Sequence, residues 1–180
     1  MKKPLWIVAA LLLIAGSAYA YGGKIAYFDI QTVMNKTTLG KKYQGIASGY
    51  YESRKKVLDT DAEEIQKLRE DYDKQKQANI NDPAQKEKED ILNRKIAEFE
   101  KIRAEFGDEI SKKNEELTNE FNQHVFAVLK DIAKREKLSL VLNRTISISK
   151  VEVQSVVYAD EGLDITGKIV AEMNKKEVVQ

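Results

Sequence analysis

The sequence predicts an α+β protein in which a long antiparallel helical hairpin, a coiled-coil-like arm, projects from a small β-rich body. Residues 50–106 contain no glycine and a single proline, Pro83, and about half of them are charged. Because proline and glycine break helical periodicity most strongly, one break between two long segments indicates two helices folded back on each other. Short segments rich in β-branched residues lie on both sides of this region and predict the strands of the body.

Both predicted arms carry apolar residues at seven-residue spacing, which is typical of coiled-coil helices. The outgoing arm has Tyr51, Leu58, Ile65 and Tyr72, and the returning arm has Leu92, Phe99 and Phe106, with Ile96, Ile110, Leu117 and His124 in a second series. Charged residues such as Arg54 and Asp61 interrupt the series, which favours a loose, bendable arm. Each arm of roughly 38 residues is expected to reach about 55–60 Å. His124, the only histidine, is expected to pack on the apolar side of its helix.

The turn between the two arms is predicted near residues 79–83. Asp82 can cap the returning helix, and Pro83 suits its first position. Gln85 completes a capping box, which satisfies amide donors that otherwise have no partner. Ile80 is the apolar residue at this tip.

The body is predicted from two groups of short strands. A strand over 24–30 and a short helix over 31–35 precede the arm, while strands over 138–142 and within 146–158 follow it. A last helix is expected at about 166–175. Such short strands have bare edges and bury little apolar surface by themselves. Several subunits that pool their strands into one closed barrel would remove these edges, so the sequence predicts an oligomer.

Residues 1–20 have the features of a cleaved secretory signal peptide. Lys2 and Lys3 precede an apolar run over 5–15, and residues 18–20 (AYA) fit the small-x-small cleavage pattern. An uncleaved N-terminal anchor is the alternative, although the run is shorter than the ~20 residues that span a bilayer. The chain has no cysteine, which excludes disulfides, thiol catalysis and a lipid-modified N-terminal cysteine. We therefore expect an exported protein.

Several segments resemble the Skp/OmpH family of periplasmic chaperones. They are residues 24–33 (KIAYFDIQTV) with 40–42 (GKK), residues 138–144 (LSLVLNR), and residues 157–160 (VYAD) with 163–166 (LDIT). They occur in this order across essentially the whole chain after the signal peptide, with the predicted hairpin between the first and second groups.

The resemblance implies an ATP-independent holdase of the periplasm, which binds unfolded outer-membrane proteins between its arms and prevents their aggregation. It also implies a homotrimer whose body is a small β-barrel shared between subunits. In this arrangement residues 21–42 and 138–180 form the body, and residues 43–137 form the arm. No cofactor, metal or catalytic residue is expected. An unfolded barrel protein exposes apolar surface and strand edges that aggregate, so enclosure would protect it.

Two sets of residues are the predicted contact sites. The subunit interface is expected to include apolar residues of the strands, namely Ile25, Tyr27, Phe28, Leu140, Leu142, Val157 and Tyr158. Client contacts are expected at aromatic and tip residues of the arm, namely Tyr50, Tyr51, Tyr72 and Ile80. Tyr50 and Tyr51 point about 100° apart on a helix, so one can pack while the other faces outward. Interior packing is the alternative for the arm aromatics.

Two features depart from the family. Residues 52–120 carry 15 Lys/Arg and 20 Asp/Glu, a net charge of −5, whereas the arms of the family are basic. Acidic arms disfavour lipopolysaccharide or a membrane surface as a partner, and the near-neutral whole chain predicts no attraction to nucleic acid. Residues 145–154 form a longer link than usual before the 157–160 segment and are expected to add a hairpin to the body.

Some of these residues also permit other functional interpretations. Residues 162–168 match the spacing of a phosphate-binding loop, but Ile169 stands where such a loop needs Ser or Thr for Mg²⁺. A turn that caps the last helix through Asp164 or Thr166 is the preferred interpretation. A structural or adaptor protein of the envelope, whose hairpin binds another coiled coil, is the alternative to a chaperone. An enzyme is not expected, because the sequence offers no catalytic constellation.

Overall fold

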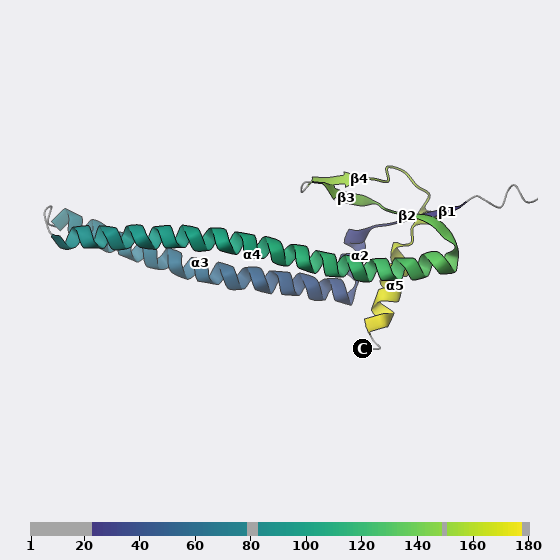
Figure 1. Cartoon of the computed structure of the whole chain (residues 1–180), viewed down its shortest axis with the longest axis horizontal. Helices are drawn as coiled ribbons and strands as arrows, with labels where there is room; N and C mark the ends of the chain where they lie inside the picture. Colours follow the sequence, from purple (N-terminus) through teal and green to yellow (C-terminus); the bar gives the residue numbers. More distant parts are fainter. Residues whose placement is uncertain (1–22, 79–82, 149–150, 178–180) are drawn as a thin grey trace, which may run out of the picture. The chain divides into compact units, whose positions relative to one another are not determined.

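The computed structural model describes residues 23–78, 83–148 and 151–177. The chain divides into two compact units (Figure 1). The arm unit consists of residues Thr38–Gln123. The strand unit consists of the chain up to Thr37 together with the chain from His124 onward. The predicted signal peptide over 1–20 lies outside the described residues.

Long helices make up the arm unit. Helix α3 (Thr38–Ala78) has 41 residues, and helix α4 (Pro83–Glu136) has 54 residues, of which those up to Gln123 belong to this unit. At 1.5 Å per residue, α3 is about 61 Å long. Helix α4 begins at Pro83, where the missing N–H is not needed. The predicted cap Asp82 lies outside the described residues.

The apolar seam of the arm unit is thin. Among its described residues, large apolar side chains are buried at Leu92, Leu117 and Phe121. The other residues of the seven-residue series on α3, such as Leu58 and Ile65, are exposed or half-buried. The Tyr43 ring meets the Phe121 ring edge to face, with centroids 6.3 Å apart. The arm therefore gains little stability from burial and depends on side-chain contacts along its length.

The strand unit has a denser core. Strand β1 (Lys24–Phe28) pairs in parallel with β2 (Leu138–Asn143), and helix α2 (Ile30–Lys36) packs against helix α5 (Thr166–Glu177). Its buried apolar residues are Ala26, Tyr27, Phe28, Val33, Val125, Val128, Leu129, Ile132, Ile165, Ile169 and Met173. Gly23 precedes β1 at a close approach, since a Cβ there would lie 2.6 Å from the Cβ of Ser139.

Side-chain hydrogen bonds connect the three sequence segments of the strand unit. The Asp29 carboxylate accepts from the Thr32 amide and caps α2, while the Asp29 amide donates to the Thr166 hydroxyl over 2.9 Å. The amide of Ile30 donates to the Asn143 side chain. Asp164 accepts from the Thr166 amide at the start of α5, as expected for a capping turn. Thus the polar residues of the resembling segments satisfy backbone donors that packing would leave unpaired.

Residues 145–154 form the expected hairpin. Strand β3 (Thr145–Ile148) pairs antiparallel with β4 (Val151–Gln154). Residues 146–158 were predicted to hold one or two strands, and β3 and β4 lie there, but residues 156–158 form no strand in the single chain. The amides of Ser155 and Val156 both donate to the Arg144 carbonyl. A short 3-10 helix η1 (Glu161–Leu163) follows.

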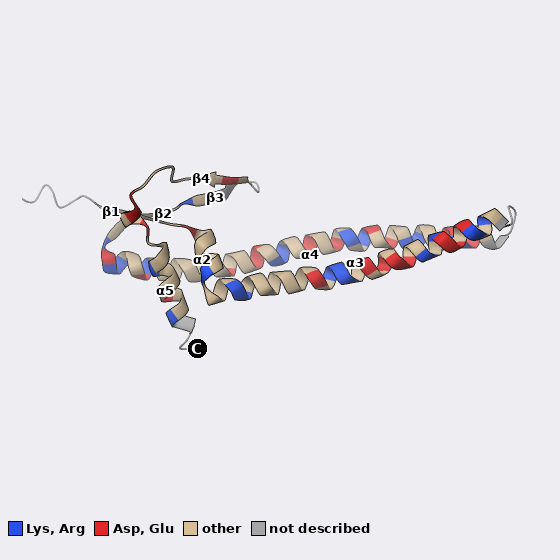
Figure 2. Ribbon diagram, turned by 180° about the vertical axis from the view of Figure 1, so that it is seen from behind, with Lys and Arg blue, Asp and Glu red and all other residues tan. Residues whose placement is uncertain are grey.

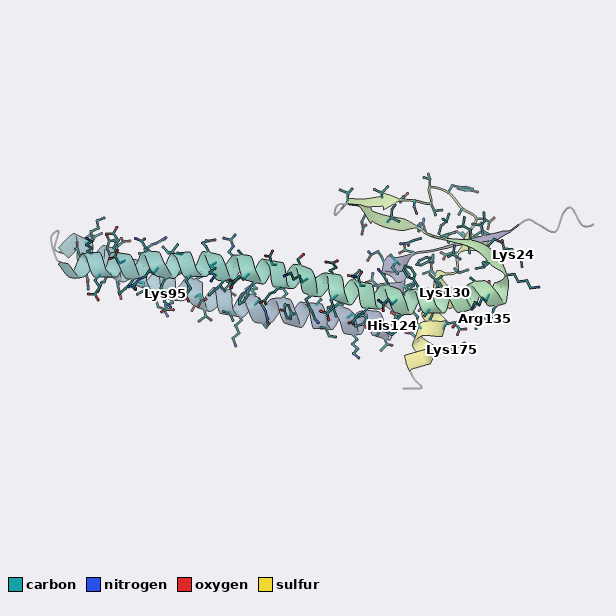
Figure 3. All side chains as sticks on the ribbon, viewed as in Figure 1. Lys24, Lys95, His124, Lys130, Arg135 and Lys175 are labelled. Carbon is teal, nitrogen blue, oxygen red and sulfur yellow. The ribbon has the colours of Figure 1, made fainter. Side chains whose placement is uncertain are left out.

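One residue of α4, His124, and the residue that follows α4, Lys137, differ from what was expected. His124 is exposed in the chain, so the prediction of a packed core histidine is wrong (Figure 3). Its neighbour Val125 takes the buried position instead. The residue after α4, Lys137, has φ of 57°, the left-handed conformation in which glycine usually ends a helix. This residue reverses the chain from α4 into β2 at a conformational cost of about 1 kcal/mol.

Candidate assembly and client-binding surfaces

One face of the β1–β2 pair is only partly covered within the chain, at Tyr27. Ile25 pairs in register with Leu140, and Tyr27 pairs with Leu142, so the four residues share a face. Ile25, Leu140 and Leu142 are exposed. The opposite face, which carries Ala26 and Phe28, is buried in the core of the strand unit. Parallel strands are normally covered on both faces, so this surface is suited to contact with another chain.

Tyr27 and Phe28 lie inside the strand unit. The Tyr27 carbonyl accepts from the Ile165 amide over 2.9 Å, and the Arg144 guanidinium lies 6.0 Å from the Tyr27 ring centre. Phe28 is buried on the core side of β1, and its carbonyl accepts from the Arg144 amide. These two predicted interface residues therefore stabilise the subunit itself.

The segment after the β3–β4 hairpin presents the most exposed apolar residues. Val157 is 88% exposed and Tyr158 is 91% exposed. Both were predicted interface residues, and both lie outside regular secondary structure. Side chains so open to water gain most from a partner that covers them.

A polar cluster joins α3 to α4 in the arm unit. The Tyr50 hydroxyl donates to Glu109 over 3.1 Å, and the Arg54 Nε and Nη2 atoms donate to the same carboxylate oxygen over 3.2 and 3.0 Å. The Arg54 guanidinium also lies 4.0 Å from the centre of the Tyr50 ring. The hydrogen bonds from Arg54, and then from Tyr50, hold the pKa of Glu109 below its ordinary value. Tyr50 is thus engaged in contact between the arms.

Tyr51, the neighbour of Tyr50, faces outward. It is 49% exposed, in agreement with the expected divergence of adjacent helical positions. Ile46 and Val57 on the same helix are also exposed. They are eleven residues apart, about three turns, and so lie on one side of α3. The surface of α3 therefore offers isolated apolar side chains rather than a continuous seam.

Further contacts hold the arms together toward the tip. Lys95 donates to Glu64 over 3.1 Å, a contact that raises the pKa of Lys95 (Figure 3). The Tyr72 hydroxyl donates to Glu89 over 3.3 Å. A cavity of about 100 Å³ lies beside the Lys95 contact and is lined by Asp61, Glu64, Ile65, Lys95, Glu98, Phe99 and Ile102. The predicted tip residue Ile80 lies outside the described residues.

Charges of both signs are interspersed along α3 and α4 (Figure 2). Within the described ranges, no group of three or more His, Cys, Asp or Glu residues could hold a metal ion. In the same part of the chain, no helix is both long and apolar enough to cross a membrane. The Thr166 hydroxyl, inside the phosphate-loop-like spacing, accepts from the Asp29 amide instead of facing a ligand.

The sequence analysis did not predict the contact that Arg54 makes with Glu109, nor the exposure of Ile46 and Val57. Arg54 interrupts the apolar series in the sequence, yet in the structure it forms an ion pair with Glu109 that joins α3 to α4. The sequence indication of this contact is that a basic residue, Arg54, lies in the apolar series of one helix and an acidic residue, Glu109, lies beside Ile110 in the series of the other. Ile46 and Val57 fall outside the seven-residue series, and this position off the seam was the available indication of exposure.

Known proteins resemble this chain in sequence and in fold. The family model for outer membrane proteins of the OmpH-like type matches residues 24–173. A similar solved structure is a crystal structure of a protein from Caulobacter crescentus, provisionally assigned as an OmpH-like outer membrane chaperone. The two chains are 15% identical, with a TM-score of 0.71 over 86% of this chain and 85% of the other. At this identity the likeness concerns the fold. A search of curated proteins found no match.

Proposed function

This chain belongs to the OmpH-like outer membrane protein family, and we propose that it is an ATP-independent holdase chaperone. Its clients are unfolded outer-membrane proteins, which it binds between helical arms and keeps from aggregating. It acts in the periplasm, to which the predicted signal peptide at residues 1–20 directs it before the peptide is cleaved. Its role is non-enzymatic and uses no cofactor.

The observation that carries this proposal is the thin seam of the arm unit. Helices α3 and α4 bury few apolar side chains against each other, and polar contacts such as Arg54–Glu109 join them. Scattered apolar groups on a charged surface favour many weak contacts over one specific site. Weak, dispersed contacts suit a protein that must bind varied unfolded chains and release them without ATP.

Assembly into a homotrimer completes the proposal. The described residues of one chain form two separate two-stranded sheets, each with open edges, and these strands are too few to close a barrel. We assign the subunit interface to the exposed strand residues Ile25, Leu140 and Leu142, with Val157 and Tyr158. Strands shared between subunits would cover this surface and place several arms around one client.

Client contact is assigned first to Tyr51. Its ring is exposed, whereas the hydroxyls of Tyr50 and Tyr72 are bonded across the arms. Ile46 and Val57 are further exposed apolar side chains, on another side of α3. Ile80 remains a proposed contact at the tip. The acidic arms give no reason to add lipopolysaccharide or membrane to the partners.

The test is dilution of a urea-unfolded outer-membrane protein into buffer that contains the purified protein and no ATP. Light scattering reports aggregation, and tryptophan emission reports the client, because the single tryptophan of this chain, Trp6, lies in the predicted signal peptide. Suppression at a few-fold molar excess of trimer, for several unrelated clients, is the expected result. Unchanged aggregation would overturn the holdase. A defined stoichiometric complex with one coiled-coil protein of the envelope would favour the adaptor alternative instead.

A further inference from the structure

The inserted β3–β4 hairpin carries an exposed aliphatic surface on one of its two faces. Ile146 and Val153 are direct partners in the hairpin register, so their side chains share one face with Val151. Ile146 is 40% exposed and Val153 is 41% exposed, and Val151 is more exposed still. The other face carries Thr145, Glu152 and Gln154. A hairpin covered by its own subunit would bury the aliphatic face, and this one leaves it open to water.

The same surface continues from β2 into β3. Exposure alternates along the chain from Leu140 to Ile146: Leu140, Leu142, Arg144 and Ile146 are exposed, and the residues between them are half-buried. Arg144 lies over the Tyr27 ring, on the face that also carries Ile25. Strand β3 continues onward from the end of β2 (Figure 1). The outer residues of β1–β2 and of the hairpin therefore form one row, interrupted by a single charged residue, Arg144.

The exposed residues of β2 and those of β3 cannot pack against each other, because they lie on the same side of one continuous row. Residues on the same side of a continuous strand point the same way, whereas sheets pack with their apolar faces opposed. The cover for Leu142 and Ile146 must therefore come from outside this strand. A bare aliphatic sheet surface with open edges also promotes aggregation whenever it is uncovered. An unfolded client would cover this surface only while it is bound, so a permanently bound partner is needed to keep the surface from water.

We propose that the aliphatic face of the hairpin, with Ile146, Val151 and Val153, packs against a second copy of this chain. The face extends the subunit interface beyond the β1–β2 surface. This inference rests on the proposed assembly of the protein, because a monomer would have no such partner. A second copy matches the hairpin face in chemistry, since it brings the same uncharged, β-branched surface of Ile146, Val151 and Val153 in fixed stoichiometry.

The first test compares two adjacent residues of β4 on opposite faces. Val153→Asp and Gln154→Asp add the same negative charge, and both positions are exposed in the single chain. Val153→Asp should raise the concentration at which the oligomer dissociates by about tenfold or more, because a buried charge without a partner is costly. Gln154→Asp should leave it near the wild-type value. Mass photometry and sedimentation measure dissociation, and circular dichroism shows whether the helices remain.

The second test identifies the occupant and does not depend on a disruptive change. The chain has no cysteine, so Val153→Cys or Gln154→Cys gives one thiol for attachment of a maleimide-benzophenone photocrosslinker. Irradiation without client should give a covalent product of two chains from Val153→Cys and much less from Gln154→Cys. Equal yields, or a product that forms only when client is added, would overturn the second copy as occupant. An oligomeric wild type that both Asp variants leave intact would overturn the inference alone, whereas a monomeric wild type would overturn the proposed assembly.

Discussion

The strand unit and the arm unit stabilise themselves by different means. In the strand unit, residues from both ends of the chain bury a shared apolar core that includes Val33, Ile132 and Ile169. In the arm unit, apolar side chains stay largely half-exposed, and pairs such as Arg54–Glu109 and Glu64–Lys95 join the helices. Apolar burial stabilises far more than exposed ion pairs do. The comparison indicates that the strand unit is the more stable of the two, and that helices α3 and α4 can separate from each other at low cost in free energy.

The largest expected difference is in the response to lost apolar volume. Ile169→Ala should lower the free energy of unfolding by about 2–5 kcal/mol, because Ile169 is completely buried and its loss leaves a cavity. Ile65→Ala removes the same atoms from the half-buried arm seam and should cost about 1 kcal/mol or less. Urea unfolding followed by circular dichroism at one protein concentration measures both. Equal costs would mean that the two units do not differ in the way proposed.

A smaller effect is expected from the hydrogen bonds that connect segments of the strand unit. Thr166→Val keeps the side-chain shape but removes the acceptor for the Asp29 amide, and Thr166 is 6% exposed. An amide left without a partner there should cost about 1–3 kcal/mol. Thr166→Ser keeps the hydroxyl and serves as the matched control in urea unfolding. If the serine variant lost as much stability as the valine variant, the methyl group and not the hydrogen bond would be responsible.

Sequence reasoning reached the fold through signals that are local. The long helices follow from residues 50–106, where Pro83 is the single strong breaker, and the inserted hairpin follows from the length of residues 145–154 and their β-branched side chains. Two details were not predicted because they depend on partners distant in the sequence. Val157 and Tyr158 have strand-forming side chains, but a strand needs a neighbour, and within the chain the Arg144 carbonyl takes the adjacent amides instead. His124 followed the apolar spacing, yet Val125 beside it takes the buried position.

Only the structure distinguishes the exposed residues among the proposed contacts from the buried ones. Periodicity grouped Tyr27 and Phe28 with Ile25, although the first two are buried in their own subunit and Ile25 is exposed. Likewise, sequence spacing showed that Tyr50 and Tyr51 must diverge, but not which of them would meet Glu109. Such distinctions depend on the rotation of each element about its axis, which is set by contacts across the fold.

The polar contacts of the arm should show a dependence on pH. The lowered pKa of Glu109 means that its ionised form stabilises the folded arm above the ordinary value of 4.5, and that this contribution is lost as the pH falls through the lowered pKa. Glu109→Gln should therefore be less stable than wild type near neutral pH, and the difference should shrink below about pH 4.5. Hydrogen exchange in the arm helices measures it. Glu105→Gln, which removes an exposed pair within α4, should change little at any pH.

The smallest expected effect concerns client binding by one exposed ring. Tyr51→Ser should raise the protein concentration needed for half-suppression of client aggregation by about two- to threefold, as for one of many weak contacts. Tyr50→Phe removes the hydroxyl bonded to Glu109 while it keeps the ring, so it should loosen the arm without weakening client binding. Light scattering on the same client measures both variants. A greater loss with Tyr50→Phe than with Tyr51→Ser would place client recognition in the contacts between arms, and would contradict the assignment of the exposed surface of α3.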